Sequence, residues 1–159
     1  MLLRIAFLIL ILAAFLSCRQ TTNMHTNQTF AFRLKPGQDL KKEILHQVRE
    51  RQINAGWIAT CVGSLTNYHI RFANQTTGSS DSGHFEIVSL TGTVSVNGSH
   101  LHISVSDSTG KTIGGHLLDG NIVYTTAEIV LISSHDYVFK REKDGTTEWE
   151  ELQVEEIKK

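Results

Sequence analysis

Residues 91–116, TGTVSVNGSHLHISVSDSTGKTIGGH, hold the clearest structural signal in the chain. Alternating apolar and polar residues flank Asn97-Gly98, which indicates a β-hairpin closed by a two-residue turn. Counting outward from that turn predicts four opposed pairs: Ser95 with His100, Val94 with Leu101, Thr93 with His102 and Gly92 with Ile103. We therefore expect an antiparallel sheet built around this hairpin.

The two faces of the predicted hairpin differ in chemistry, because successive side chains of a strand point to opposite faces. The face expected in the core carries aliphatic side chains: Val94, Val96, Leu101, Ile103 and Val105. The other face of the second strand carries polar ones: His100, His102, Ser104 and Ser106. The pattern thus places two imidazoles side by side on one polar face, opposite small cross-strand partners.

The two imidazoles have the spacing of a metal-binding pair. His100 and His102 stand about 7 Å apart at the root, since each residue of a strand rises about 3.3–3.4 Å. That separation lets both rings reach one bound ion, and His116 could supply a third ring after Gly114-Gly115. The glycines would let the backbone come close without a Cβ clash. Neutral imidazole suits Zn²⁺, and three protein ligands leave a fourth position open.

A His-x-His pair also occurs on strands that bind no metal. The rings could be solvated on an exposed strand, or they could hydrogen-bond across a polar subunit interface. His69 and His84 lie on or near predicted strands and could approach the site, whereas His25, His46 and His135 are expected away from it. Spacing alone leaves these alternatives open.

The chain begins with a segment that looks like an export signal. Arg4 precedes the apolar run IAFLILILAAFL, which is shorter than the roughly 20 residues of a membrane span. Ser17 directly before Cys18 looks like a bacterial lipobox, although Phe15 stands where leucine is usual. We expect residues 1–17 to be a signal peptide, Cys18 to carry lipid, and the protein to be an extracytoplasmic, membrane-anchored lipoprotein. The alternatives are a secretory signal cleaved nearby, giving a secreted protein, or an uncleaved anchor.

The remainder of the 159-residue chain has the length of one domain. We expect residues 18–28 to form a polar tether, residues 29–154 the domain and residues 155–159 a polar tail. If Cys18 carries lipid, Cys61 has no partner for an intrachain disulfide. The apolar neighbours of Cys61 predict a buried, unreactive thiol.

Charge argues against nucleic acid as a partner. The formal net charge is −1, no block of Lys or Arg occurs, and residues 148–156 are acidic. A domain that binds nucleic acid normally carries a basic stripe. We therefore assign no residue to nucleic-acid binding.

One helix and several short strands are expected. Asp39 is the predicted N-cap of the helix and Gly56 its C-terminal cap, with one apolar stripe formed by Leu40, Ile44 and Val48 and with Leu45 beside it. The strands are expected at residues 30–34, 57–62, 67–72, 85–96, 99–107, 111–117, 122–132, 137–141 and 147–154, with an exposed loop at residues 73–82. This order predicts an α+β fold, a mainly antiparallel and strongly curved sheet with one packed helix.

A family resemblance sharpens these expectations. GHFEIVSLTGTVS (83–95), HLHISVSDSTGKTIGGHLLDG (100–120) and VYTTAEIVL (123–131), in this order and spacing, resemble the plants and prokaryotes conserved (PPC) domain. GSLTNYHIRF (63–72) is similar to the segment that precedes the variable loop of that family. The resemblance runs from about residue 30 to residue 152, and the composite HLHISxSDxxGxxxGGHLL makes it specific.

The resemblance implies properties that spacing could not show. It implies an α+β fold also seen in acetolactate decarboxylase, assembly as a homotrimer, and a metal, with zinc the expected ion, on the family's histidines, here His100, His102 and His116. The family is also labelled DNA-binding, largely because plant members carry AT-hooks, Arg-Gly-Arg-Pro segments that enter the minor groove. This chain has a single proline, Pro36, and no Arg-Gly-Arg, so that element is missing.

Two functional hypotheses remain. In the first, the chain is a trimeric binding or scaffold module whose metal is structural. In the second, it is a small metal-dependent enzyme, of lyase or hydrolase type, that acts on a carboxylate or ester outside the cytoplasm. Such an enzyme needs a proton-transfer group and perhaps a cation for its substrate, and Glu86 and Arg71 are candidates by type and strand placement. The alternative is that these two residues form a surface salt bridge.

Overall fold

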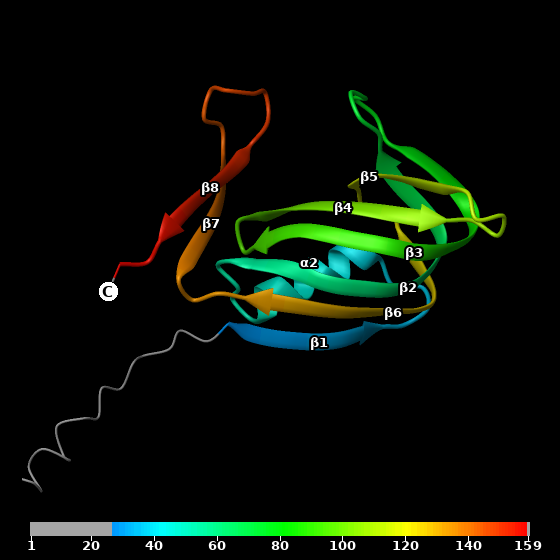
Figure 1. Cartoon of the computed structure of the whole chain (residues 1–159), viewed down its shortest axis with the longest axis horizontal. Helices are drawn as coiled ribbons and strands as arrows, with labels where there is room; N and C mark the ends of the chain where they lie inside the picture. The colour runs from blue at the N-terminus through cyan, green and yellow to red at the C-terminus, as the bar shows by residue number, and fades with distance from the viewer. Residues whose placement is uncertain (1–26, 159) are drawn as a thin grey trace, which may run out of the picture.

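The computed structural model describes residues 27–158 as a six-stranded antiparallel sheet, one helix and a separate two-stranded hairpin (Figure 1). The strand order of the sheet is β1-β6-β2-β3-β4-β5. The elements are β1 (Gln28–Leu34), α2 (Leu40–Glu50), β2 (Gly56–Arg71), β3 (Ser79–Ser95), β4 (Gly98–Ser106), β5 (Thr112–Leu117), β6 (Ile122–Ser133), β7 (Tyr137–Glu142) and β8 (Glu151–Glu156). The predicted α+β class is confirmed.

The expected signal peptide, residues 1–17, and the expected lipidation site, Cys18, lie outside the described residues. Within residues 27–158, no helix combines the length and the apolar character that crossing a membrane requires.

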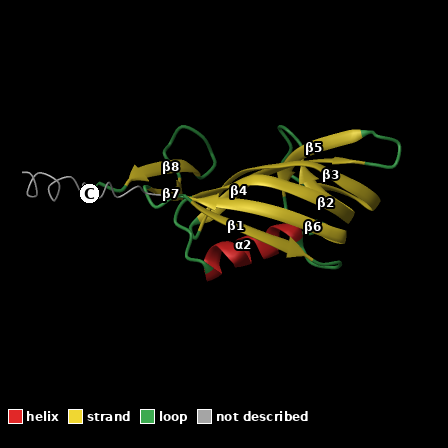
Figure 2. Cartoon of the chain, turned by 60° about the horizontal axis from the view of Figure 1, so that its bottom comes forward, coloured by secondary structure: helices red, strands yellow, loops and turns green. Residues whose placement is uncertain are grey.

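Helix α2 begins as its sequence predicts. The Asp39 carboxylate accepts a hydrogen bond from the backbone N–H of Lys42 at 3.1 Å, as an N-cap does. Leu40, Ile44 and Val48 are fully buried and face the sheet, which the helix covers on one side (Figure 2). Burying a side chain of this size contributes about 1.5–3 kcal/mol, so this stripe holds the helix against the sheet.

Helix α2 ends earlier than its sequence predicts. Gln52 adopts a left-handed conformation at φ 51°, and its N–H bonds to the Arg49 carbonyl at 3.0 Å. The N–H of Ile53 bonds to the Val48 carbonyl, also at 3.0 Å, which completes a Schellman motif. The prediction of Gly56 as the cap is wrong, because glutamine takes the left-handed position and Gly56 already starts β2.

The β3–β4 hairpin turns one residue earlier than predicted. The turn residues are Val96 and Asn97, so the observed pairs are Ser95 with Gly98, Val94 with Ser99, Thr93 with His100, Gly92 with Leu101 and Thr91 with His102. The Val96 N–H bonds to the Ile53 carbonyl at 2.9 Å, and Ser95 Oγ and Asn97 Nδ2 both donate to the Phe139 carbonyl. Contacts with distant segments therefore fix this turn.

The two faces of the hairpin survive the change of register, because each residue slips past its expected partner by two positions. Leu101, Ile103 and Val105 are buried as predicted, and so is Val94. Val96 is the exception: it lies in the turn, the residue is 36% exposed, and its predicted place in the core is wrong.

Two of the predicted strands form a single strand in the structure. Strand β2 runs without a break from Gly56 to Arg71 and so joins the strands expected at residues 57–62 and 67–72, although bulges interrupt its pairing with β3 and β6. Gly63 lies at a bulge with φ 148°, where a Cβ would collide with the Thr126 carbonyl. The expected loop at residues 73–82 is also shorter, since Ser79–Ser82 pair with β2.

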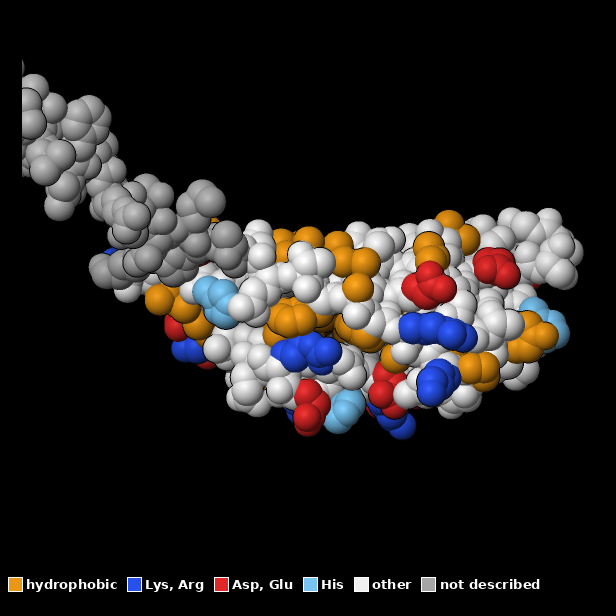
Figure 3. Space-filling model, turned by 90° about the horizontal axis from the view of Figure 1, so that it is seen from below, with side chains coloured by type: hydrophobic (Ala, Val, Ile, Leu, Met, Phe, Trp, Pro, Cys, Tyr) orange, Lys and Arg blue, Asp and Glu red, His pale blue; other side chains and the backbone are white. Residues whose placement is uncertain are grey.

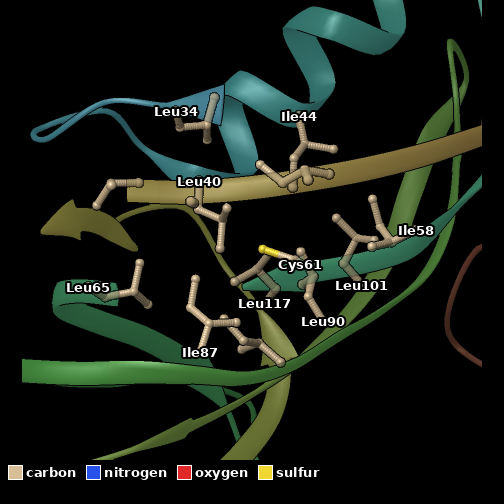
Figure 4. Packing of buried hydrophobic residues seen from close by; sticks show 14 of the residues in the cluster. Leu34, Leu40, Ile44, Ile58, Cys61, Leu65, Ile87, Leu90, Leu101 and Leu117 are labelled. Carbon is tan, nitrogen blue, oxygen red and sulfur yellow. The ribbon is translucent and has the colours of Figure 1, made fainter. Parts of the chain in front are cut away.

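The core fills the space between helix α2 and the sheet (Figure 4). Ile44 and Leu40 of the helix point toward Cys61, Leu90 and Leu117 of the sheet. Cys61 is buried and free, and burial raises the pKa of its thiol to about 12. The predicted burial of Cys61 is confirmed, and its low reactivity stays a prediction.

Candidate metal centre

Three histidines from two adjacent strands converge on one point. His100 and His102 stand on the same face of β4, and His102 lies directly opposite His116 of β5. One ring nitrogen of each lies within 4.8 Å of the others, and the Nε2 atoms of His100 and His102 are 3.1 Å apart. The predicted convergence is therefore found within a single chain, and this cluster could hold a metal ion.

Glycines bring β5 close enough for this convergence. A Cβ on Gly115 would lie 2.5 Å from the Arg71 carbonyl of β2, and one on Gly114 would lie 2.8 Å from the Ile103 carbonyl of β4. Any side chain at these two positions would push β5 away from its neighbours. The expected role of the pair before His116, a close backbone approach, is confirmed.

The environment favours the neutral form of two of the three imidazoles, those of His100 and His116. Burial lowers the pKa of His116 to about 4, with His100 and Arg71 as the next causes. Burial also lowers the pKa of His100, and neighbouring His102 and Arg141 act in the same direction. A neutral ring nitrogen is the form that binds a metal ion, so the electrostatics favour a ligand set over a cluster of cations.

One further observation fits a metal. Nδ1 of His116 is buried without a hydrogen-bond partner, the one such side-chain nitrogen or oxygen within residues 27–158. Buried polar atoms nearly always have a partner. His100 and His102 remain exposed while His116 is half-buried, so the cluster opens to solvent on one side. Three imidazoles with an open side form a donor set that suits Zn²⁺.

The sequence suggested two further residues for this site, Arg71 and Glu86, and the structure places only one of them near it. Arg71 lies opposite His116 in the β2–β5 pair and reaches the centre. Glu86 lies opposite Ser106, four residues along β4 from His102, or about 13 Å at the rise of a strand. The nomination of Glu86 is therefore wrong for this site, whereas that of Arg71 stands.

Two residues of the β7–β8 hairpin approach the centre, and sequence reasoning missed both. Arg141 donates from Nη2 to the Thr93 hydroxyl at 2.6 Å, and Thr93 lies opposite His100. Glu151 lines a cavity together with His100 and His102, and its charge acts to raise the pKa of His100. No local pattern marks either residue, because the hairpin meets the sheet through contacts such as Phe139 N–H to the Asn54 carbonyl at 2.9 Å.

Cavities flank the centre on two sides. One of about 470 Å³ is lined by His102, His116, Arg71 and the small residues Ser89 and Thr91. Another of about 660 Å³ lies under the β7–β8 hairpin. Its walls include two arginines, two histidines and two apolar residues: Arg71, Arg141, His100, His116, Leu118 and Trp149. Both volumes fall in the range of small-molecule sites.

The sequence and structure are similar to those of known proteins. The Plants and Prokaryotes Conserved (PCC) domain, also abbreviated PPC, matches residues 21–135, short of the residue 152 that we expected. A Synechococcus protein, bifunctional protein GlmU, is 42% identical over 130 residues, which are 82% of this chain and 21% of that protein. The chain thus spans about a fifth of the length of the curated relatives it matches.

Two solved structures have the same fold. A Salmonella enterica protein is 38% identical, with a TM-score of 0.81 over 84% of this chain and 97% of that one. A protein of Archaeoglobus fulgidus, described as metal-containing, is 25% identical, with a TM-score of 0.68 over 79% of this chain and 93% of that one. The matched family segment ends before β7, so the β7–β8 hairpin lies outside it.

Proposed function

Because the chain belongs to the Plants and Prokaryotes Conserved domain family, we propose that it is a metal-binding module in which His100, His102 and His116 hold one divalent ion, zinc in the first place. The observation that carries this proposal is the approach of three ring nitrogens, one from each histidine, to within 4.8 Å of one another. The similar Archaeoglobus fulgidus protein that is described as metal-containing adds support.

The chain's own residues explain how the site would work. Cross-strand pairing fixes the ring positions of His102 and His116, so the ligands need little rearrangement to bind an ion. Burial lowers the pKa of both His100 and His116, and Arg141 and Arg71 act in the same direction on His100, so protonation of these two rings competes less with the ion. The ion would supply a concentrated positive charge at the floor of both cavities.

Assembly and location complete this proposal. We include a homotrimer, as the family resemblance implies, and export with a membrane anchor at lipidated Cys18, with a secreted form as the alternative. An exposed apolar pair supports association: Val62 and Val88 are 53% and 57% exposed, and the β2–β3 register places them opposite each other. The segment before residue 18 supports export by its composition.

Nucleic acid is left out of the proposed function. The chain has a formal net charge of −1 and no Arg-Gly-Arg segment. On the face that Figure 3 shows, Lys and Arg side chains are interspersed with Asp and Glu and form no stripe. Binding to duplex DNA at low salt that disappears at physiological salt would agree with this view, whereas salt-resistant binding would contradict it.

A second candidate function is a small metal-dependent enzyme of lyase or hydrolase type. The observation in its favour is the position of Glu151 and Arg141, which line a cavity of about 320 Å³ together with His100 and His102. A carboxylate and a guanidinium at a metal centre can move a proton and hold an anionic group. In this candidate Glu151 takes the role that the sequence assigned to Glu86.

The metal content of the purified protein tests the proposal. We expect about one zinc per chain in the wild type and a loss of most of it in His102→Ala. His84→Ala is the matched control, because the His84 ring packs on Tyr124 at 4.3 Å between centroids and lies outside the cluster. Equal metal content in the wild type and His102→Ala would contradict the proposal.

A further inference from the structure

The β7–β8 hairpin forms a wall of the metal centre although it lies outside the matched family segment. Figure 1 shows it at the end of the sheet where the β3–β4 turn lies. Three hydrogen bonds attach it there: Ser95 Oγ and Asn97 Nδ2 donate to the Phe139 carbonyl at 2.9 and 3.2 Å, and Arg141 donates to Thr93 at 2.6 Å. The cavity beneath the hairpin is therefore a built feature of this chain.

Two guanidinium groups reach this cavity from opposite elements. Arg71 comes from β2 and Arg141 from β7, and both line the cavity with His100 and His116. Each guanidinium carries five N–H donors. Within residues 27–158 each makes a single side-chain hydrogen bond, Arg71 to the Gln75 carbonyl and Arg141 to Thr93, and neither is in a salt bridge. Most of their donors are thus free for a ligand.

The cavity also has an apolar side, and its carboxylates disfavour a ligand with more than one negative charge. Leu118 and Trp149 line it, and the Arg71 guanidinium lies 5.1 Å from the centre of the Trp149 ring. Besides the two arginines, the charged side chains that line it are one lysine, Lys143, and three carboxylates, Glu148, Glu150 and Glu151. An inorganic anion would not use the apolar wall, and a second negative charge on the ligand would face these carboxylates.

We infer that the cavity under the β7–β8 hairpin binds a small organic monocarboxylate, with its carboxylate group between Arg141 and Arg71 and its apolar part against Trp149 and Leu118. This inference rests on the proposed metal function, since the ion on the three histidines would add to the positive charge that the carboxylate meets. Guanidinium forks match the two oxygens of a carboxylate and hold it by charge-assisted hydrogen bonds. The hairpin is then the element that gives this chain its ligand specificity.

Calorimetry on the full-length, zinc-loaded protein tests this inference, with 4-phenylbutyrate as the probe and its uncharged amide as the matched ligand. We expect the carboxylate to bind and the amide to bind at least about tenfold more weakly. Arg141→Gln should weaken carboxylate binding by about 10- to 100-fold, the value of a lost charge-assisted contact. Arg33→Gln is the matched control, because Arg33 also donates to a threonine hydroxyl, that of Thr126, away from the cavity.

A second variant separates binding from folding. Arg141→Gln also removes a hydrogen bond that attaches the hairpin to β3, whereas Arg71 reaches the same cavity from β2, makes no hydrogen bond to the hairpin and contacts it through the Trp149 ring. Arg71→Gln should therefore weaken binding of the probe with a smaller change in the midpoint of unfolding in urea than Arg141→Gln. Zinc is measured in every sample. A protein with full zinc that binds acid and amide equally, or that binds the acid equally well in both arginine variants, overturns the inference and leaves the metal proposal intact. A wild-type protein without zinc overturns the metal proposal itself.

Discussion

At the scale of single residues, Gly92 shows how closely the metal centre depends on backbone geometry. Its φ is 137°, which side-chain-bearing residues rarely adopt, and a Cβ there would collide with the His100 carbonyl. Gly110 has a comparable φ of 83°, but a Cβ there would meet nothing within 4 Å. The two glycines therefore differ in the space around them while sharing a left-handed backbone.

A strained backbone alone costs about 1–3 kcal/mol. We expect Gly92→Ala to lower the free energy of unfolding by more than this, because the collision of the new Cβ adds to the strain. Gly110→Ala should cost only the strain, about 1 kcal/mol. Urea denaturation measures both. Metal content should also fall in Gly92→Ala, since the residue that must move carries a ligand. Equal midpoints for the two variants would contradict this explanation.

Cys61 provides a second test at this scale. Burial raises its pKa from 9.0 to about 12, so the reactive thiolate is about 1,000-fold rarer than for a free thiol at the same pH. In a Cys18→Ser background, Cys61 is the sole thiol of the chain. We expect Ellman's reagent to leave the folded protein unmodified for hours at pH 8 and to titrate one thiol in urea. Rapid reaction without denaturant would show that the region around Cys61 opens.

At the scale of the elements, Asp39 joins two of them. One of its carboxylate oxygens caps helix α2, and the other accepts the Gly120 N–H at 2.7 Å in the connection between β5 and β6. The helix is thus tied at its first turn to the strand connection behind β5, which carries His116.

We expect Asp39→Ala to lower the free energy of unfolding by about 2 kcal/mol, which combines the loss of an N-cap with an unpaired N–H. Asp39→Asn should cost less, because the asparagine oxygen still caps the helix and only the bond from Gly120 is lost, since the amide nitrogen that replaces Oδ2 cannot accept a hydrogen bond. Denaturation midpoints in urea rank the two variants. A cost for Asn equal to that for Ala would mean that the cap contributes nothing.

The same element shows how local signals limit prediction. The start of helix α2 was predictable, because an N-cap depends on a few adjacent residues, here Asp39 and the apolar stripe that follows it. Its end was not, because Gln52 occupies a left-handed position that usually attracts glycine, and Gly56 looked like the better candidate. Packing of Val48 and Ile53 into the core outweighs the small preference of the backbone at residue 52.

At the scale of the whole molecule, the proposed trimer is open to a direct test. Val88→Asp places a charge on the exposed apolar pair of β2 and β3, and we expect the native mass to fall from three chains to one. Val154→Asp is the matched control, since Val154 has a similar exposure, 53% against 57% for Val88, on the separate β7–β8 hairpin. Light scattering after size exclusion measures both. A monomeric wild type, or a trimer unaffected by Val88→Asp, would contradict the proposed arrangement.

The sequence by itself determined the alternation of each strand, the start of the helix, and the set of three histidines with the glycines that let the third approach. These features depend on residues a few positions apart, so a pattern of spacing records them. Only the tertiary structure decided the position of the turn at Val96-Asn97. It also decided that Arg141 and Glu151, and not Glu86, lie beside the metal centre. The physical reason is that those choices rest on contacts between segments 40 or more residues apart, such as Asn97 with Phe139 and Thr93 with Arg141. No local spacing encodes where a separate hairpin meets the end of a sheet.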